Sequence, residues 1–283
     1  MNIGIVGLGL IGGSLAKAFK KNSDFKVYTC DKNEVVQKQA VLLGATDGTL
    51  DSETISVCDF IFICLYPSAT LDYMKKNAHL VKKGAIVLDC CGVKGSVCPT
   101  MFSLAEREGF TYVGGHPMAG RQFSGFKYAT EDLFSGSCMI LVLRAGEGIE
   151  TIERVKKCLE KAGFGHITTT TAEEHDEIIA YTSQLAHVVS NAYVKSPRAE
   201  VHKGFSAGSY RDLTRVAKLS EEMWTELFMD NRENLMRELD FIINSLAEYR
   251  DALSVADRAK LKSLLREGRE QKERIDEEWR ESE

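Results

Sequence analysis

The sequence predicts an α/β fold, in which an N-terminal Rossmann-type, doubly wound, mostly parallel sheet is followed by an all-helical C-terminal domain. Short β-rich runs alternate with helical patterns as far as about residue 170, which is typical of βαβ units. A glycine-rich turn joins the first run to the first helical pattern. Beyond Ala172 the strand signals stop, and apolar residues recur at helical spacing. We therefore expect two domains, 1–168 and 169–283.

The expected strands are seven apolar runs in the first half of the chain. They read NIGIVG, FKVYTCD, DFIFICLYP, GAIVLDCC, FTYVGG, SCMILVL and HITTTT. They lack a regular alternation of apolar and polar residues, so helices should cover both faces of the sheet. In the second half, residues 175–194 and 221–249 have helical periodicity. The charged segment 255–279 is expected to form a solvated or a partner-facing helix.

Composition excludes several classes of protein. The chain has 283 residues, of which 44% are apolar and 27% charged, and its net charge of −5 includes no dense basic stretch. Nucleic-acid binding is therefore not expected. The eight cysteines form no C-x-x-C pair, which speaks against a metal site and for free thiols in a reducing compartment. The N-terminal residues contain no basic leader. No apolar run approaches the ~20 residues needed to cross a membrane. We therefore expect a cytoplasmic protein.

A dinucleotide fingerprint opens the chain. The motif G-x-G-x-x-G follows the first strand and begins a helix, which is its required context. Its residues are Gly7, Leu8, Gly9, Leu10, Ile11 and Gly12. Asp31 ends the second strand, where a carboxylate can accept hydrogen bonds from ribose hydroxyls and would repel a 2′-phosphate. We therefore predict NAD as the cofactor. Three residues after the run DFIFIC either line the cofactor pocket or form an ordinary turn: Leu65, Tyr66 and Pro67.

His116 is the candidate catalytic base. It follows the run TYVGG, so we expect it to project from a loop at the carboxyl edge of the sheet, where ligands bind in doubly wound folds. A dehydrogenase that oxidises an alcohol carbon needs a proton acceptor, and a neutral imidazole suits that role. Gly114 and Gly115 would let the backbone approach a ligand. A structural histidine in a turn is the alternative that the pattern leaves open.

The helical half adds two groups of polar residues. Ser183 and His187 are four apart and would share one helix face. Asp212 and Arg215 are three apart, so they could pair with each other or point at one ligand, and Trp224 follows them. Each group also has an ordinary interpretation, since His187 could be a core histidine and the other two a surface ion pair.

In combination, these motifs resemble the prephenate dehydrogenase family, which includes the arogenate and cyclohexadienyl dehydrogenases of tyrosine biosynthesis. The resemblance covers roughly residues 3 to 246 and rests on GLGLIGGSLAKAF, D-x-C-G-V-K-G, G-G-H-P-M-A-G, E-H-D…S-x-L-x-H and D-L-T-R followed by M-W. It implies NAD-dependent oxidative decarboxylation of prephenate to 4-hydroxyphenylpyruvate. The related reaction of arogenate, which forms tyrosine directly, is the alternative.

The resemblance also implies roles by position. His116 matches the family's catalytic histidine, Arg215 its carboxylate-binding arginine, and His187 a second histidine of the substrate pocket. Supporting residues of that pocket are Asp212, Trp224 and Ser183. Gly92, on the cofactor side, stands where many members carry a serine whose hydroxyl lies near the catalytic histidine.

Two departures leave the preferred substrate open, because Gln184 and Ala186 replace a histidine and a proline of some relatives. Two other functions remain possible on the same plan. One is a β-hydroxyacid dehydrogenase or imine reductase, for which Lys195 is the only candidate proton donor, and the other is a nucleotide sensor without turnover. The segment between Glu221 and Leu246 has more apolar residues than one buried helix face needs. We therefore expect a homodimer through the helical domain.

Overall fold

A computed structural model describes residues 1–121, 123–144, 146–202 and 204–282. The chain divides into two compact units, Met1–Arg232 and Glu233–Glu283. Within the described residues, the first unit holds an eight-stranded sheet of order β3-β2-β1-β4-β5-β6-β7-β8. The strands are β1 (Asn2–Val6), β2 (Lys26–Cys30), β3 (Gly48–Thr49), β4 (Phe60–Ile63), β5 (Ile86–Asp89), β6 (Thr111–Pro117), β7 (Cys138–Val142) and β8 (His166–Thr170).

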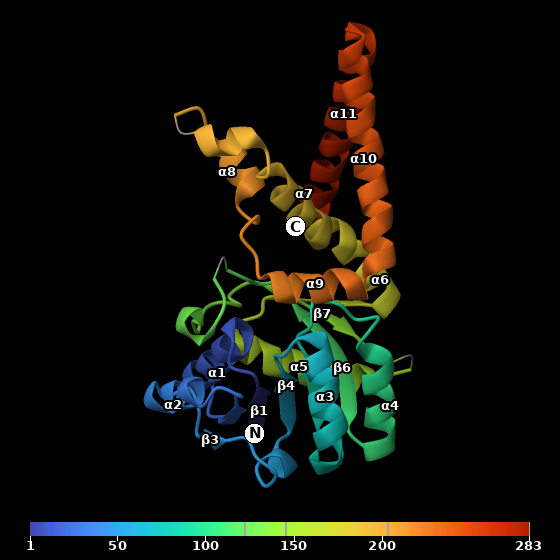
Figure 1. Ribbon diagram of the computed structural model, residues 1–283. Coiled ribbons are helices and arrows are strands. Elements are labelled where there is room, and N and C mark those ends of the chain that lie inside the picture. The colour runs from blue at the N-terminus through green and yellow to red at the C-terminus, as the bar shows by residue number, and fades with distance from the viewer. Residues whose placement is uncertain (122, 145, 203, 283) are drawn as a thin grey trace. The chain divides into compact units, whose positions relative to one another are not determined.

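The sheet is parallel except between β6 and β7, so the predicted fold class is confirmed. Its helices are α1 (Leu10–Asn22), α2 (Glu34–Leu42), α3 (Pro67–Asn77), α4 (Cys98–Glu108) and α5 (Ile149–Ala162). Helices α1 and α5 contact each other on one face, and α3 and α4 contact each other on the opposite face (Figure 1).

Alternate side chains of the central strands pack into two separate hydrophobic cores. In β4, Phe60 and Phe62 join the core beneath α1 and α5, whereas Ile61 and Ile63 join the core beneath α3 and α4. All four side chains are buried. A strand that is buried on both faces needs apolar residues at every position, which explains why the sequence shows continuous apolar runs there.

The prediction that His116 lies on a loop is wrong, because it belongs to β6. This strand changes partner along its length: Thr111–Val113 pair with β5 in parallel, and Gly114–Pro117 pair with β7 in the antiparallel sense. His116 itself lies opposite Ile140. The antiparallel partner comes from a distant part of the sequence, so it extends β6 beyond the residues that local pattern could identify.

The first unit continues as helices α6 (Ala172–Ile179), α7 (Ala186–Tyr193), α8 (Gly208–Thr214) and α9 (Glu221–Asp230). A π-helical turn at Ala180–Leu185 joins α6 to α7, where the periodicity predicted one uninterrupted helix. A π-turn accommodates an additional residue per turn and often lies at functional sites.

The second unit consists of α10 (Arg232–Ser254), from Glu233 onward, and α11 (Arg258–Ser282). The charged segment 255–279 is thus almost entirely helical, as predicted. Five large apolar side chains of α10 are 56–68% exposed: Met236, Phe241, Ile243, Leu246 and Leu253. Within the described part of the chain, no helix combines the length and the apolar character needed to cross a membrane.

Candidate active site

The glycine loop between β1 and α1 is shaped by two positions that exclude side chains. Gly7 has a φ of +87°, in the region that favours glycine. A Cβ on Gly12 would lie 1.9 Å from the Gly7 carbonyl oxygen, so α1 can pack against the loop only if this residue is glycine. A Cβ on Gly9 would meet nothing within 4 Å. The space in front of Gly9 is therefore open.

The N-terminus of α1 and the end of β2 offer groups that fit a dinucleotide. No side chain caps α1, whose N-cap is Gly9, so the N–H groups that begin with Leu10 and Ile11 are available to an anion such as a pyrophosphate. The Asp31 carboxylate accepts the N–H of Leu8 at 2.7 Å and the N–H of Asn33 at 2.8 Å. A carboxylate has about four acceptor sites, so two remain for ribose hydroxyls.

The other predicted cofactor residues lie at the same edge of the sheet. A Cβ on Gly7 would lie 2.8 Å from a methyl carbon of Leu65, so this leucine supports the glycine loop from below. Tyr66 is exposed at the N-cap of α3, and Pro67 is buried as the first residue of that helix. Of these three residues, only Tyr66 presents a large accessible side chain.

His116 is held at one ring nitrogen, and within the described residues no hydrogen bond reaches the other. Its Nδ1 lies 2.9 Å from Nε2 of His175, and Nδ1 of His175 lies 2.7 Å from an oxygen of Asp176. Its Nε2 faces Gly92, where a Cβ would stand 4.0 Å away. The family serine is therefore not needed to hold the imidazole, because α6 holds it from the opposite side.

Sequence reasoning gave no role to His175 and Asp176. The motif E-H-D contains both residues, and it was the only signal that could have found them. Both side chains are buried, at 2% and 5% exposure, and a buried polar residue next to a candidate catalytic group is a reasonable candidate for its support.

A buried ion pair lies beneath His116. The Lys94 ammonium contacts the Asp89 carboxylate and donates to the Gly115 carbonyl at 2.7 Å. Asp89 also accepts the hydroxyl of Tyr112 at 2.7 Å and the N–H of Gly115 at 3.1 Å. The lysine and aspartate side chains are 1% and 0% exposed. This network fixes the peptide group that immediately precedes His116.

Gly114 and Gly115 are required by the packing of this network. A Cβ on Gly114 would lie 2.9 Å from the Cys98 sulfur and 3.2 Å from the Lys94 stem. A Cβ on Gly115 would lie 2.5 Å from the Asp89 carbonyl oxygen. The two glycines make room for the β5–α4 segment that carries the ion pair.

The surroundings of His116 keep its imidazole neutral. Burial lowers the pKa of His116 well below its ordinary value, and the neighbouring His175 and the Lys94 ammonium lower this pKa further. A cation would be poorly solvated there and would lie close to another positive charge. These surroundings therefore favour the neutral imidazole at neutral pH.

Helix α9 closes over the carboxyl edge of the sheet (Figure 1). Its Glu226 accepts the N–H of Ser68 at the start of α3 at 2.7 Å, and its Asp230 accepts the Ser96 hydroxyl at 2.8 Å. Between them, the Leu227 methyl groups lie 3.4 Å from where a Cβ on Gly92 would stand. Leu227 therefore packs beside Gly92, on the side of the imidazole that carries Nε2.

A second polar group lies on the other side of Leu227. His187 directs Nδ1 at the Val216 carbonyl, 3.0 Å away, and its ring centroid is 3.8 Å from that of Trp224. Burial lowers the pKa of His187, and the Arg215 guanidinium acts in the same direction, while the bond to Val216 opposes them. Because Trp224 and Leu227 are three residues apart on α9, this helix connects the two groups.

Arg215 and Asp212 are exposed and form no ion pair with each other. Among the residues that the structure describes, the Arg215 guanidinium makes no ion pair or side-chain hydrogen bond, which leaves it available to an anionic ligand. Of the two alternatives for this pair of residues, the ion pair is therefore not found. Ser183 is half-buried in the π-turn.

Gln184 has a structural role. Its amide donates to the Leu227 carbonyl at 3.1 Å and accepts from the Asn231 side chain at 2.9 Å. Asn231 also donates to the Asp176 carbonyl at 2.7 Å. These bonds tie the π-turn to α9 and to the end of α6, and the neighbouring Ala186 is exposed.

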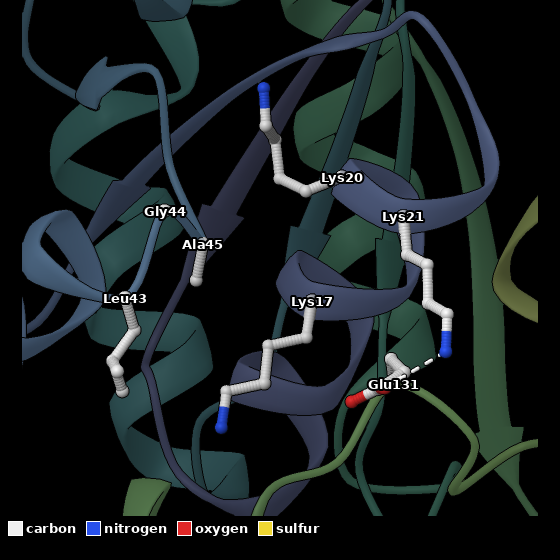
Figure 2. A pocket seen from close by; sticks show the side chains of 7 residues that line it. All are labelled: Lys17, Lys20, Lys21, Leu43, Gly44, Ala45 and Glu131. Atoms are coloured by element: carbon white, nitrogen blue, oxygen red, sulfur yellow. Dashed lines mark hydrogen bonds and ion pairs between the residues drawn. The ribbon is translucent and has the colours of Figure 1, made fainter.

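A separate hollow of about 380 Å³ lies at the far end of α1, away from the glycine loop (Figure 2). Its lining is Lys17, Lys20, Lys21, Leu43, Gly44, Ala45 and Glu131. Each lysine already has a partner: the Ala129 carbonyl for the first, Asp47 for the second and Glu131 for the third. The hollow therefore offers little uncompensated charge to a ligand.

Comparison with known proteins decides the family. The family model described as prephenate dehydrogenase, nucleotide-binding domain, matches residues 15–168, and that described as prephenate dehydrogenase, dimerization domain, matches residues 171–267. The chain belongs to the prephenate dehydrogenase family. The predicted enzyme class, an NAD-dependent dehydrogenase, is confirmed. The first match begins after the glycine loop, so the roles given to Gly7, Gly9 and Gly12 rest on their geometry.

Members of the prephenate dehydrogenase family that differ in activity resemble this chain. Cyclohexadienyl dehydrogenase of Zymomonas mobilis is 32% identical over 266 residues, covering 90% of this chain and 89% of that protein. Prephenate dehydrogenase of Bacillus subtilis is 29% identical, and the matched region covers 89% of this chain and 70% of that protein.

Solved structures agree with these sequence relatives. Prephenate dehydrogenase of A. aeolicus, in complex with hydroxyphenyl propionate and NAD+, superposes with a TM-score of 0.83 at 28% identity, covering 97% of this chain and 98% of that one. Synechocystis arogenate dehydrogenase superposes with a TM-score of 0.80 at 25% identity, covering 97% and 100%.

Gly9→Ala should keep the fold and weaken nucleotide binding. The added methyl group meets no protein atom, so the free energy of unfolding should change by less than about 1 kcal/mol. The same methyl group would stand where the loop must approach a pyrophosphate, and we expect NADH affinity, measured by fluorescence titration, to fall at least tenfold. Gly268→Ala, also free of contacts, is the matched control. Unchanged affinity in Gly9→Ala would contradict the assignment of this loop.

Proposed function

We propose that the chain catalyses the NAD-dependent oxidative decarboxylation of prephenate to 4-hydroxyphenylpyruvate. One observation carries the proposal: Nδ1 of His116 is held by His175, while Nε2 points to the side of Gly92, where a Cβ would stand 4.0 Å away. Burial lowers the pKa of this imidazole, which favours its neutral form. The ring lies at the carboxyl edge of the sheet, where ligands bind in doubly wound folds. Membership of the prephenate dehydrogenase family supports the choice of substrate class.

The cofactor would be held by the glycine loop and Asp31. When bound, NAD supplies the hydride acceptor for the ring carbon that carries the substrate hydroxyl. Nε2 of His116 accepts the hydroxyl proton as that carbon is oxidised. The ring carboxylate then leaves as CO2, and its bonding electrons complete the aromatic ring. His116 returns the proton to the phenolate oxygen, and the gain of aromaticity makes the reaction effectively irreversible.

Arg215 would orient the substrate through a carboxylate. Prephenate carries two carboxylates, and a guanidinium can bind one of them through two parallel hydrogen bonds. The side chain of Arg215 lies near His187, since its charge lowers the pKa of that histidine. The ring of Trp224 covers one side of His187, so the substrate would approach from the other side.

The alternative substrate is arogenate, because relatives include a cyclohexadienyl and an arogenate dehydrogenase. The deciding experiment measures NADH or NADPH formation by the purified chain with prephenate and with arogenate, each offered NAD and NADP. We expect the highest kcat/KM for prephenate with NAD. A higher value for arogenate would establish the alternative, and no product from either acid would overturn both.

His116→Asn should lower kcat by about 10²–10⁴-fold, since the variant has no group that can accept the hydroxyl proton. The substrate KM should change little, and His166→Gln, a substitution at an exposed histidine of β8, should behave as the wild type. A kcat within tenfold of wild type would remove His116 from the chemistry.

Activity should persist below the ordinary pKa of histidine, about 6.5. Only the neutral imidazole accepts a proton, and the groups facing His116, namely His175 and Lys94, lower its pKa together with burial. In a pH profile of kcat/KM, the acid limb should therefore begin below pH 6.5. A limb that begins above this value would show that the base is not the buried imidazole.

Arg215→Ala should raise the substrate KM by about 10–100-fold, the equivalent of one lost hydrogen bond to a charged group, while kcat falls less. Arg211→Ala is the matched control, because Arg211 is also exposed on α8. Equal KM values for the two variants would argue against a carboxylate site at Arg215.

We further propose that the chain forms a homodimer through its helical domain, 169–283, next to a nucleotide-binding domain, 1–168, and that it is cytoplasmic. The matching dimerization domain and the exposed apolar side chains of α10 support the dimer. Light scattering should give twice the chain mass of 31.5 kDa, and a mass of 31.5 kDa would contradict the proposal.

A further inference from the structure

We propose that His175 and Asp176 are positioning residues that set the tautomer of His116, placing its proton on Nδ1 and its lone pair on Nε2. The inference deepens the proposed function and rests on it for its kinetic consequence. It follows from a chain of three side chains that ends on a carboxylate. His175 contacts His116 at Nδ1, whereas Gly92 lies on the side of Nε2, so the proposed role acts through His116 and needs no contact with the substrate.

Asp176 is the fixed end of this series of hydrogen-bonded side chains. Its carboxylate accepts the backbone N–H groups of Lys94 and Gly95, both at 2.8 Å, and lies 2.7 Å from Nδ1 of His175. A Cβ on Gly95 would lie 2.9 Å from one carboxylate oxygen, so the turn admits the carboxylate only because this residue is glycine. An ionised carboxylate only accepts hydrogen bonds, and Nδ1 of His175 must therefore be the donor.

The tautomer of His175 then determines that of His116. A neutral imidazole has a single N–H, so once Nδ1 of His175 carries it, Nε2 is a bare acceptor. Nδ1 of His116, 2.9 Å away, must supply the proton of that hydrogen bond, which leaves Nε2 of His116 without one. The reverse tautomer of His116 would place two lone pairs against each other. His175 is 0% exposed in its side chain, so water cannot relieve that conflict.

The same three hydrogen-bonded side chains accommodate the charge that appears during turnover. When His116 gains a proton at Nε2, its Nδ1–H still donates to His175, and the positive ring is connected through His175 to the negative carboxylate of Asp176. The other charged groups near His116 are Lys94 and its partner Asp89, and the Lys94 ammonium opposes a positive charge on His116. Asp176, joined to His116 through His175, is the anion that would offset this effect.

The direct test is long-range ¹H–¹⁵N correlation spectroscopy of histidine-labelled protein, with the His116 signals assigned by their loss in His116→Asn. The two ring nitrogens have distinct shifts when protonated and when bare. We expect His116 to be protonated at Nδ1 and bare at Nε2 in the wild type, and to lose this preference in His175→Leu. A wild-type His116 protonated at Nε2, or an unchanged pattern in His175→Leu, would overturn the proposal.

A conservative variant separates positioning from packing. In His175→Gln the side-chain oxygen can replace Nε2 as the acceptor for His116, whereas leucine cannot. We expect kcat to fall about 10–100-fold in His175→Leu and less than about fivefold in His175→Gln, with the NAD and substrate KM values nearly unchanged. Equal losses in the two folded variants would mean a purely structural role. If wild type turned over neither acid, the proposed function would fail, while the spectra would still decide the tautomer.

Discussion

The buried ion pair between Asp89 and Lys94 is the interaction on which the geometry of the site depends. Two charges removed from water are tolerated only when they are paired and their remaining hydrogen-bonding capacity is used. Here the carboxylate also accepts hydrogen bonds from the Tyr112 hydroxyl and the Gly115 N–H, and the ammonium also donates to the Gly115 carbonyl. The pair therefore joins the end of β5 to the middle of β6. Removing either partner would leave an uncompensated charge directly below His116.

Two features follow from this pair. The ammonium contributes to the lowered pKa of His116, so the same group that fixes the strand also favours the neutral base. The turn that carries Lys94 also presents two N–H groups to Asp176. The sheet and α6 are thus bound to each other at the point where His116 and His175 meet. Positioning of the base does not require a ligand, because all of these contacts exist within the protein.

Much of the fold could be predicted because its signals are local. Continuous apolar runs, the glycine motif and the helical periodicity each depend on neighbouring residues. The two-residue strand β3 was too short to show any pattern. The placement of His116 failed for a different reason: its strand is extended by pairing with β7, and the partner of His116 is Ile140. Strand ends set by distant partners cannot be located from local sequence.

The candidate site was predicted in part. His116, Arg215 and His187 were selected from the sequence pattern and given roles by resemblance, and the structure shows how each is surrounded. The support of the base was missed because it depends on contacts between residues far apart in the chain, such as the 59 positions that separate His116 from His175. Lys94 was missed because lysine is almost never fully buried, and nothing in its immediate sequence reveals the aspartate that makes burial possible.

The partner change within β6 has a consequence for how a substrate is received. A histidine on a free loop could adjust to its ligand, whereas His116 sits in a ladder, opposite Ile140, with its ring tied to α6. The His116 imidazole is therefore held in one position. In the proposed reaction, alignment of the reacting carbon would therefore come from the substrate's other end, where the exposed Arg215, at the end of a short helix, has the freedom of a long side chain. Small differences in ligand length would be absorbed there, and not at the proton acceptor.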